Sequence, residues 1–315
     1  MTDASIEVQG LSKNFLRGRP ALQEATFRYE GSGAIGYLGP NGAGKTTTLK
    51  LLTGLLRPSA GTARINGVNV IEHRKEALAD VGAIIESPEP YPSQTVAEAI
   101  EMVAEFRGGR SAGIGREIDE LNAKLELPPL NARCGRLSKG QRQRVSIAAS
   151  LVRDPRVIIL DEPTSGLDPK ERILIRNLLN VLKKDHLILM SSHLMQEVTE
   201  ICDHVIFINE GQILLRDSVE NVATRFRTRA VEVEFATPMP IDRIQALGSV
   251  VGEVRVVGER RFRIAFDGSV SARAEILRGL VGLGPVLSYQ SASLVLEDAY
   301  LALMQNESPA PGAAG

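Results

Sequence analysis

One short stretch of the chain, GPNGAGKTTT, limits the possible fold more than any other feature. It places four residues between Gly39 and Gly44 and continues with Lys45 and Thr46. An apolar, strand-like run precedes it, and a helix-like stretch follows it. Glycines at such a turn let successive backbone N–H groups point inward around a phosphate, and the helix N-terminus adds a positive dipole. The stretch therefore predicts a parallel sheet with a strand–loop–helix unit shaped to surround a phosphate.

The side chains of this loop indicate a nucleotide with a metal ion. Lys45 would bring a positive charge to the β- and γ-phosphates, and Thr46 would offer its hydroxyl to Mg²⁺. A glycine-rich turn without a ligand is the alternative, but it does not explain the full spacing between a strand and a helix. The candidate nucleotide-binding residues are Gly39, Pro40, Asn41, Gly42, Ala43, Gly44, Lys45, Thr46 and Thr47.

A second stretch, VIILDEP, ends an apolar run in two adjacent acids, Asp161 and Glu162. Two carboxylates at a buried strand end repel each other unless a cation is bound nearby. In P-loop nucleoside triphosphatases an acid at the end of a nearby parallel strand reaches the Mg²⁺ held by the loop hydroxyl, and Asp161 fits that role. Glu162 is then a candidate general base for an attacking water. Strands often end in charged residues, so the two acids alone are not specific. They indicate a metal site because the phosphate loop is also present.

Hydrophobic periodicity predicts an α/β domain with three parts. Residues 5–15 and 25–30 alternate apolar and polar positions, as antiparallel strands with one solvated face do. Continuous apolar runs predict central parallel strands at 34–38, 157–160 and 186–192, with helices after them at 45–56, 169–184 and 194–203. Residues 95–153 read as helical throughout apart from a glycine-rich loop. We therefore predict a parallel sheet core, an antiparallel β subdomain and a helical subdomain at about 95–153.

The pattern changes near residues 224–230, which predicts a domain boundary. Beyond it the elements follow the order βαββαβ with one more helix, which is compatible with a small ferredoxin-like α+β domain. The tail is rich in Pro, Ala and Gly, and we expect it to be disordered. The predicted domains are 1–224, with a linker at 225–230, an accessory domain at 231–306 and a tail at 307–315.

Bulk properties narrow the classes of partner. The net charge of −1 gives no electrostatic reason to expect nucleic acid. The two cysteines are far apart and in no metal-ligand spacing, which suits a reducing compartment. The first residues have no apolar segment of the secretory type, and no apolar run approaches the roughly 20 residues of a membrane span. We expect no direct membrane insertion, so a second chain would have to bring this one to a membrane.

A third motif, LSKGQ at 137–141, lies just before the paired acids. By itself it reads as Ser138 capping an amphipathic helix. Together with the phosphate loop and the acids, however, it makes residues 5–220 resemble the ATP-binding subunits of ABC transporters, whose signature is usually LSGGQ. The resemblance implies that Ser138, Gly140 and Gln141 contact ATP held by another subunit. Lys139 replaces the first glycine, and we expect activity to survive that change.

The resemblance also implies roles for three further residues. Phe15 would stack on adenine, although an aromatic at this place would otherwise be a core residue. Asp168, at the end of SGLD, would contact a second subunit, and with Pro169 after it the same residue is a good helix cap. His193, in SSH, would contact the γ-phosphate and join Glu162 as a catalytic residue, whereas a lone histidine there would usually cap a helix or face solvent.

Glu86 departs from the family pattern, because a glutamine usually stands at this position. A glutamate could still approach Mg²⁺ or its water; alternatively, it faces solvent. The segment resembles ABC-2-type exporters of the bacitracin- and lantibiotic-resistance kind, some of which carry Glu here. The final helix, LVLEDAYLALMQ, is also similar to the ending of many such exporter ATPases, whereas sugar-importer ATPases carry an all-β domain.

One phosphate loop and one signature in a chain cannot complete a pair of sites. The resemblance therefore implies a second copy or a related ATPase subunit, and an integral-membrane permease chain, with this subunit cytoplasmic and peripheral on the inner face of the membrane. One alternative is a soluble ABC-type ATPase that acts on nucleic acid or the ribosome, but there is no heptad run and no second cassette. Another is a catalytically dead subunit, which the presence of Lys45, Asp161, Glu162 and His193 disfavours.

Overall fold

The computed structural model describes residues 4–15, 20–86, 89–108, 113–225, 230–291 and 295–304. The chain divides into two compact units, Met1–Val219 and Glu220–Gly315. This division falls a few residues before 224, where the sequence placed the end of the first domain. Most of the expected linker, and all of the tail expected at 307–315, lie outside the described residues.

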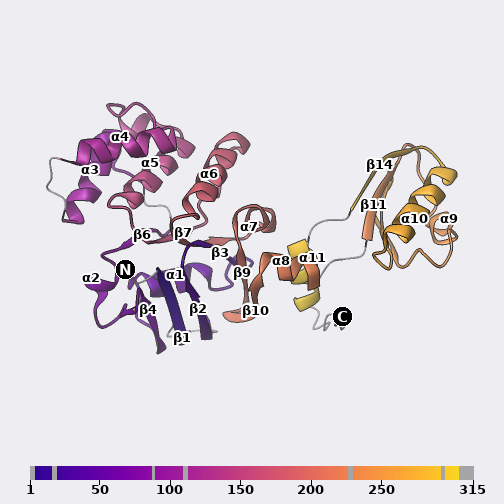
Figure 1. The fold of residues 1–315 in the computed structure, drawn as a ribbon, viewed down its shortest axis with the longest axis horizontal. Helices are drawn as coiled ribbons and strands as arrows, with labels where there is room; N and C mark the ends of the chain where they lie inside the picture. The colour runs from indigo at the N-terminus through magenta and orange to yellow at the C-terminus, as the bar shows by residue number, and fades with distance from the viewer. Residues whose placement is uncertain are drawn as a thin grey trace. The chain divides into compact units, whose positions relative to one another are not determined.

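A six-stranded sheet forms the centre of the first unit, in the order β10-β9-β3-β8-β7-β6 (Figure 1). Its parallel strands are β3 (Gly33–Leu38), β6 (Val81–Ile84), β7 (Val157–Asp161), β8 (Leu187–Ser192) and β9 (His204–Asn209), and β10 (Gln212–Ser218) is antiparallel to β9. Every residue of β7 and β8 is buried, which is why both read as continuous apolar runs. The predicted parallel core is confirmed.

A second sheet, antiparallel, has the order β2-β1-β4-β5. Its strands are β1 (Ser5–Lys13), β2 (Leu22–Glu30), β4 (Ala60–Ile65) and β5 (Val68–Asn69). A single apolar core that includes Phe27, Tyr37 and Leu49 joins this sheet to the parallel one and to α1 (Lys45–Leu52). Because α1 is buried in that core, the loop before it has a fixed position.

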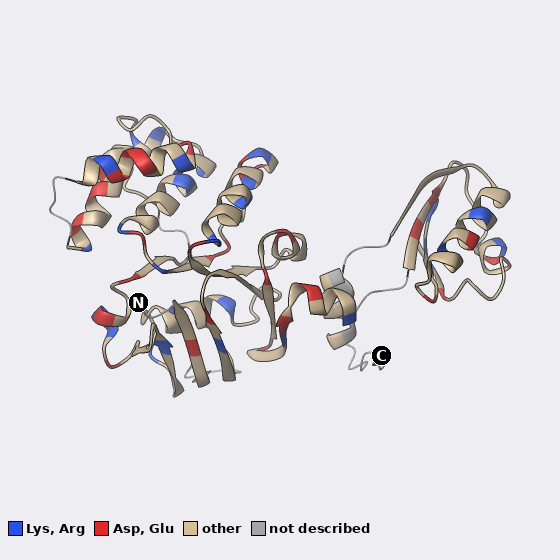
Figure 2. Ribbon diagram, in the orientation of Figure 1, with Lys and Arg blue, Asp and Glu red and all other residues tan. Residues whose placement is uncertain are grey.

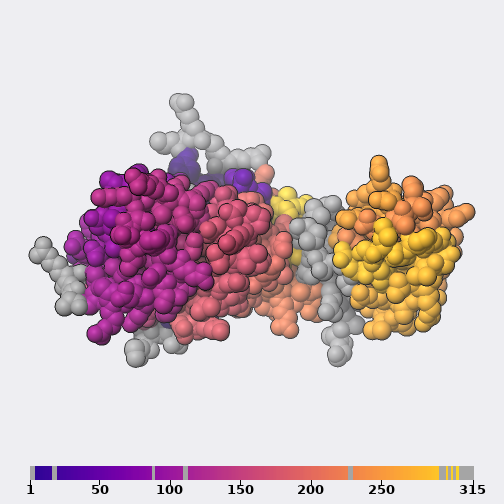
Figure 3. Space-filling view, turned by 90° about the horizontal axis from the view of Figure 1, so that it is seen from above, coloured from indigo at the N-terminus to yellow at the C-terminus, as the bar shows by residue number. Residues whose placement is uncertain are grey.

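The helical section consists of α3 (Val96–Phe106), α4 (Ile114–Leu125) and α5 (Lys139–Leu151), and its magenta residues form a continuous surface in Figure 3. The expectation of helix throughout 95–153 was wrong for residues 126–138, which hold only a short 3₁₀ turn, Cys134–Arg136. Pro128 and Pro129 explain this interruption, since a proline has no N–H to donate within a helix and disfavours helical backbone before it.

Four further helices belong to the first unit or lie at its boundary with the second. They are α2 (Arg74–Ala77), α6 (Pro169–Leu182), α7 (Met195–Ile201) and α8 (Val219–Arg225). Helix α7 packs closely on β3, since a Cβ at Gly36 would lie 2.5 Å from a methyl group of Val198. Among the residues that the structure describes, no helix has the length and apolar character needed to cross a bilayer.

The second unit contains the predicted βαββαβ order and a final helix. Its elements are β11 (Ala230–Phe235), α9 (Ile241–Gln245), β12 (Val254–Gly258), β13 (Arg261–Ala265), α10 (Val270–Leu283), β14 (Val286–Ser291) and α11 (Val295–Met304). The strands form an antiparallel sheet, β12-β13-β11-β14, over a core that includes Phe235, Phe262 and Ile276. Acidic and basic positions are intermixed along the strands and helices of both units (Figure 2).

Candidate functional site

Three loops meet at one edge of the parallel sheet. Strands β3, β8 and β7 are consecutive neighbours, so their carboxyl ends lie side by side. The phosphate loop follows β3, His193 follows β8, and Asp161 and Glu162 lie where β7 ends. Ligands of open α/β sheets bind at such an edge.

The phosphate loop is shaped by close backbone approaches. Gly44 has a φ of +108°, and a Cβ there would lie 2.3 Å from the carbonyl oxygen of Ala21. A Cβ at Gly39 would lie 2.2 Å from the carbonyl oxygen of Ile208. No side chain caps the N-terminus of α1. Its first N–H groups, which have no partner within the helix, therefore remain for an anion.

Lys45 is folded back onto this loop and is almost fully buried. Its Nζ donates to the carbonyl oxygens of Gly39 (2.8 Å) and Pro40 (3.2 Å) and lies 3.4 Å from Glu162 Oε1. A buried ammonium is stable only with such partners. A bound phosphate would offer stronger, charged partners at the same place.

Asp161 accepts hydrogen bonds from three different segments. Thr46 Oγ1 donates to its Oδ2 (2.8 Å), Ser191 Oγ donates to Oδ1 (2.5 Å), and the backbone N–H of Glu86 donates to Oδ2 (3.3 Å). One carboxylate beside a hydroxyl suits Mg²⁺, which binds hard oxygen ligands and usually takes one or two from protein and others from phosphates. The residues present fit a nucleotide-bound Mg²⁺.

Glu162 lies between two basic groups. Its backbone adopts a left-handed φ of +45°, which is uncommon for a residue with a side chain. Its Oε2 lies 3.1 Å from His193 Nδ1, and Ser191 Oγ accepts from its N–H at 3.0 Å. Burial opposes ionisation, but the hydrogen bond and charge of His193, with the charge of Lys45, hold the pKa of Glu162 below its usual value. The carboxylate is therefore ionised and able to accept a proton.

The backbone of Glu86 contacts Asp161, but its side chain points to a different partner. Its N–H reaches Asp161, whereas its carboxylate forms an ion pair with Lys50 of α1. The carboxylate is 64% exposed, and the backbone φ is +64°. Whether the side chain approaches a metal remains the prediction given above.

The signature residues lie at the start of α5. Ser138 Oγ accepts from Gln141 N (3.1 Å), and the Gln141 side chain accepts from Ser138 N (2.9 Å), so the two cap the helix reciprocally. Gly140 is packed against α6, because a Cβ there would lie 2.4 Å from the Glu171 side chain. Lys139 Nζ donates to the carbonyl oxygen of Ser165 at 3.0 Å. In the described part of the chain, no hydrogen bond or ion pair joins Ser138 to the phosphate loop.

Asp168 and Phe15 lie outside the acid cluster. Asp168 caps α6, as the sequence predicted, by accepting from Glu171 N at 3.0 Å with Pro169 at the first helical position. Phe15 is 49% exposed, and the Lys13 ammonium lies 5.2 Å from its ring centroid. The ring is therefore accessible for stacking on a planar ligand.

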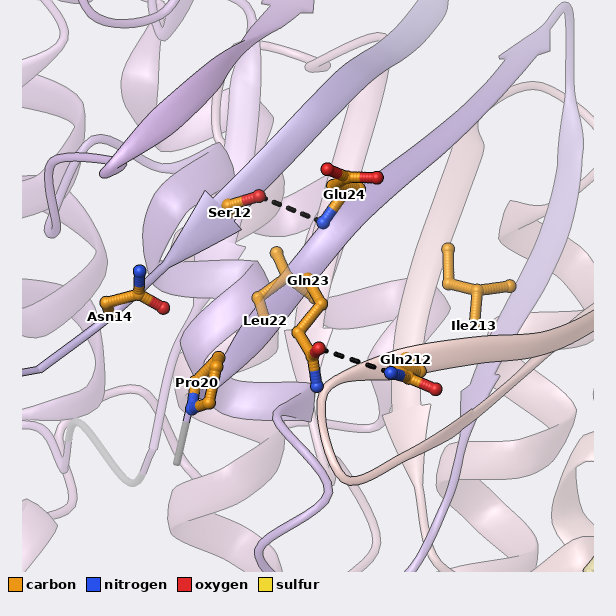
Figure 4. Close-up of a pocket in the computed structure, with 8 residues that line it drawn as sticks. All are labelled: Ser12, Asn14, Pro20, Leu22, Gln23, Glu24, Gln212 and Ile213. Carbon is orange, nitrogen blue, oxygen red and sulfur yellow. Dashed lines mark hydrogen bonds between the residues drawn. The ribbon is translucent and has the colours of Figure 1, made fainter. Parts of the chain in front are cut away.

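A polar hollow of about 580 Å³ lies near Phe15, between β1, β2 and β10 (Figure 4). Asn14 and Pro20 line one side of it, and the carboxamides of Gln23 and Gln212 are hydrogen bonded across another (3.2 Å). None of the acids at the sheet edge lines this hollow. The candidate site of ATP hydrolysis is therefore the sheet edge with its three loops, and not this hollow.

One residue of the site, Ser191, was missed in the sequence. Its hydroxyl is buried and joins Asp161 Oδ1 to the N–H of Glu162. The register of β7 and β8 pairs Asp161 with Ser191, and this register is not visible in a one-dimensional pattern.

Comparison with known proteins identifies relatives of the chain. The family model described as "ABC transporter" matches residues 22–165. The ABC transporter ATP-binding protein NatA of Bacillus subtilis is 32% identical over 222 residues, which cover 70% of this chain and 90% of NatA. The Nod factor export ATP-binding protein I of Paraburkholderia xenovorans is 30% identical over 310 residues, which cover 98% of this chain and 99% of that protein.

Solved structures agree with these relatives. A structure described as the ATP-binding subunit of an ABC transporter superposes with a TM-score of 0.63 and 28% identity. It covers 70% of this chain, and the match spans 92% of that structure's chain.

Replacing Lys45 with Ala tests the phosphate loop. The variant should lose ATP binding, or bind ATP at least about 100-fold more weakly, because the phosphates lose their fixed cation. Isothermal titration with a non-hydrolysable ATP analogue measures this effect. Lys75→Ala, which removes an exposed lysine of α2, is the matched control and should bind normally. Equal affinities in the two variants would contradict the assignment.

Proposed function

Because the chain belongs to the family of ABC transporter ATP-binding subunits, it is an ATPase that powers a membrane transporter, and we propose that this transporter is an exporter. The convergence of the phosphate loop, Asp161 and Glu162 at one sheet edge is the observation that carries the catalytic assignment. We also propose roles for the individual residues of this edge.

The phosphate loop and α1 bind ATP. Backbone N–H groups of the phosphate loop and of the first turn of α1 surround the phosphates, and Lys45 exchanges its carbonyl partners and Glu162 for phosphate oxygens. Thr46 and Asp161 hold Mg²⁺, which when bound neutralises charge on the phosphates. The adenine stacks on the exposed ring of Phe15.

Glu162 acts as the general base. The oxygen of a water attacks the γ-phosphorus, and a proton of that water passes to the Glu162 carboxylate. The bond from the γ-phosphorus to the bridging oxygen breaks, which leaves ADP and inorganic phosphate. His193, 3.1 Å from Glu162, orients the carboxylate and lies near the departing γ-phosphate.

A second copy of the chain completes each site. In the proposed dimer, Ser138, Gly140 and Gln141 of one copy face the ATP on the phosphate loop of the other, and Asp168 lies at the contact. The N-terminus of α5, with Lys139 at its first position, would present positive charge to the γ-phosphate. A C2 arrangement uses each surface twice and builds two equal sites.

The exporter assignment is supported by similarity along nearly the whole chain. The relative described as a Nod factor export ATP-binding protein aligns through the second unit as well as the first. Between β6 and β7 the chain forms the compact helices α3 to α5 rather than a coiled coil, which favours transport over the soluble alternative. We place the subunit on the cytoplasmic face of a membrane, attached through a permease.

An apolar hollow offers a place for the permease to bind. It has a volume of about 210 Å³ and is lined by β6, α3 and α5, including Ile84, Met102 and Val145. It adjoins the segment that reaches Glu86, whose N–H donates to Asp161. A permease segment in this hollow would therefore press on a chain segment that contacts the proposed metal-binding acid.

Amide variants of the two adjacent acids should differ in whether they still bind Mg-ATP. Asp161→Asn removes charge that holds Mg²⁺, so Mg-ATP binding and hydrolysis should both fall. Glu162→Gln keeps its shape but accepts no proton, so Mg-ATP should bind while kcat falls by about 100-fold or more. Binding by titration and turnover by phosphate release separate the two effects. If Glu162→Gln hydrolyses ATP at the normal rate, the base lies elsewhere.

The Lys50–Glu86 ion pair gives two variants with opposite expected effects. If the Glu86 carboxylate assists the metal, Glu86→Gln should raise the Mg²⁺ concentration needed for half-maximal hydrolysis, because a unit of negative charge is lost. Lys50→Met frees that carboxylate and should lower the same concentration. A unit charge about 4 Å away is worth on the order of 4 kcal/mol before screening at an effective dielectric near 20. Unchanged Mg²⁺ titrations in both variants would place Glu86 outside the metal site.

A further inference from the structure

Glu197, in α7, is a buried carboxylate with no part in the proposed chemistry. Its side chain is only 8% exposed, although an isolated buried carboxylate is costly. Its Oε2 accepts from Thr164 Oγ1 at 2.6 Å and from Ser192 Oγ at 3.2 Å. Its other oxygen lies 3.8 Å from Arg172 Nε, which is beyond hydrogen-bonding distance. Two hydroxyls are therefore its close partners in the described part of the chain.

Those hydroxyls lie next to the proposed catalytic pair, since Thr164 is in the loop after β7 and Ser192 is the last residue of β8. Thr164 lies two residues after Glu162, and Ser192 immediately precedes His193. Both are buried, so neither residue can exchange its bond to Glu197 for water without opening. Ser192 Oγ also accepts from Leu194 N at 2.9 Å, which fixes the turn around His193.

We propose that Glu197 is a positioning residue, which bridges the loop after β7 and the end of β8 and so keeps Glu162 opposite His193. The Glu162–His193 contact of 3.1 Å joins the same two segments on the nucleotide side. The Ser191 hydroxyl also ties the end of β8 to the backbone of Glu162, and Glu197 holds the residues just beyond that connection. Loss of the Glu197 bridge would let the loop after Glu162 move away from His193. This inference rests on the proposed role of Glu162 as the base.

The same bridge connects the catalytic pair to the signature helix. Thr164 is followed by Ser165, whose carbonyl oxygen accepts from Lys139 Nζ, and Arg144 of α5 forms an ion pair with Glu171 of α6 (3.3 Å). Displacement of α5 would thus move the loop that Glu197 holds. Through these contacts, closure of a second copy over Ser138 is transmitted to Glu162 and His193.

A purely structural role for Glu197 is the competing explanation. An acid in the first turn of a helix stabilises that helix through its dipole, and Glu197 occupies the first turn of α7. Either role predicts a lower melting temperature on removal of the carboxylate, so thermal stability alone does not distinguish them.

Steady-state kinetics of the full chain distinguish the two roles. Glu197→Ala should lower kcat for ATP by about tenfold or more with KM within about twofold, since the phosphate loop is untouched. Glu197→Gln keeps one accepting oxygen and should recover part of the rate. Thr164→Val, which removes only the hydroxyl, should resemble Glu197→Ala, and the double variant should be no slower than Glu197→Ala alone.

A matched control separates loss of the bridge from a general change in α7. Glu200→Gln serves this purpose, because Glu200 lies in the same helix and pairs with Arg176 without contacting either loop. It should keep the unmodified kcat and KM.

The kinetics of these variants separate a positioning role of Glu197 from a structural one. If Glu197→Ala melts earlier but retains kcat, Glu197 only stabilises the fold and the inference is wrong. Fully multiplicative losses in the double variant would show that Thr164 and Glu197 act separately, which also contradicts it. Normal turnover in Glu162→Gln, measured in parallel, would instead contradict the proposed base.

Discussion

The site depends on the hydrogen bonds that converge on the Asp161 carboxylate. Thr46, Ser191 and the backbone of Glu86 come from three separate segments, and each donates to this one group. The carboxylate can accept all three because it lies at the end of β7, beside β8 and close to α1. It therefore fixes the relative positions of the phosphate loop, the end of β8 and the segment after β6.

Beside Asp161, the ionisable side chains of Lys45, Glu162 and His193 lie next to one another in a row. Lys45 lies between loop carbonyls and Glu162, and Glu162 lies between Lys45 and His193. Nucleotide binding would draw Lys45 toward phosphate and leave Glu162 to His193 and water. The same changes of contact would thus bind the substrate and leave Glu162 able to accept a proton.

Local patterns were sufficient to predict the phosphate loop, the strand ending at Asp161 and the cap at Asp168, because spacing along the chain determines each of them. Contacts between distant segments were not predictable in this way. Ser191 meets Asp161 through strand register, and Glu86 turns to Lys50 through the packing of α1. The helical pattern also failed at 126–138, where two prolines interrupt it. Strands β6, β9 and β10 were not predicted, since a short apolar run by its period alone does not distinguish a strand from a buried helical segment.

In the proposed dimer, each chain supplies the phosphate loop of one ATP site and the signature residues of the other. A structure of the Glu162→Gln variant with ATP and Mg²⁺ tests this arrangement most directly, because the nucleotide is not consumed. The account predicts a twofold dimer in which each ATP lies between the phosphate loop of one copy and Ser138 of the other, with the metal at Thr46 and Asp161 at about 2.1 Å or through one water. A monomer whose ATP contacts only its own chain, or a metal bound away from Asp161, would contradict it.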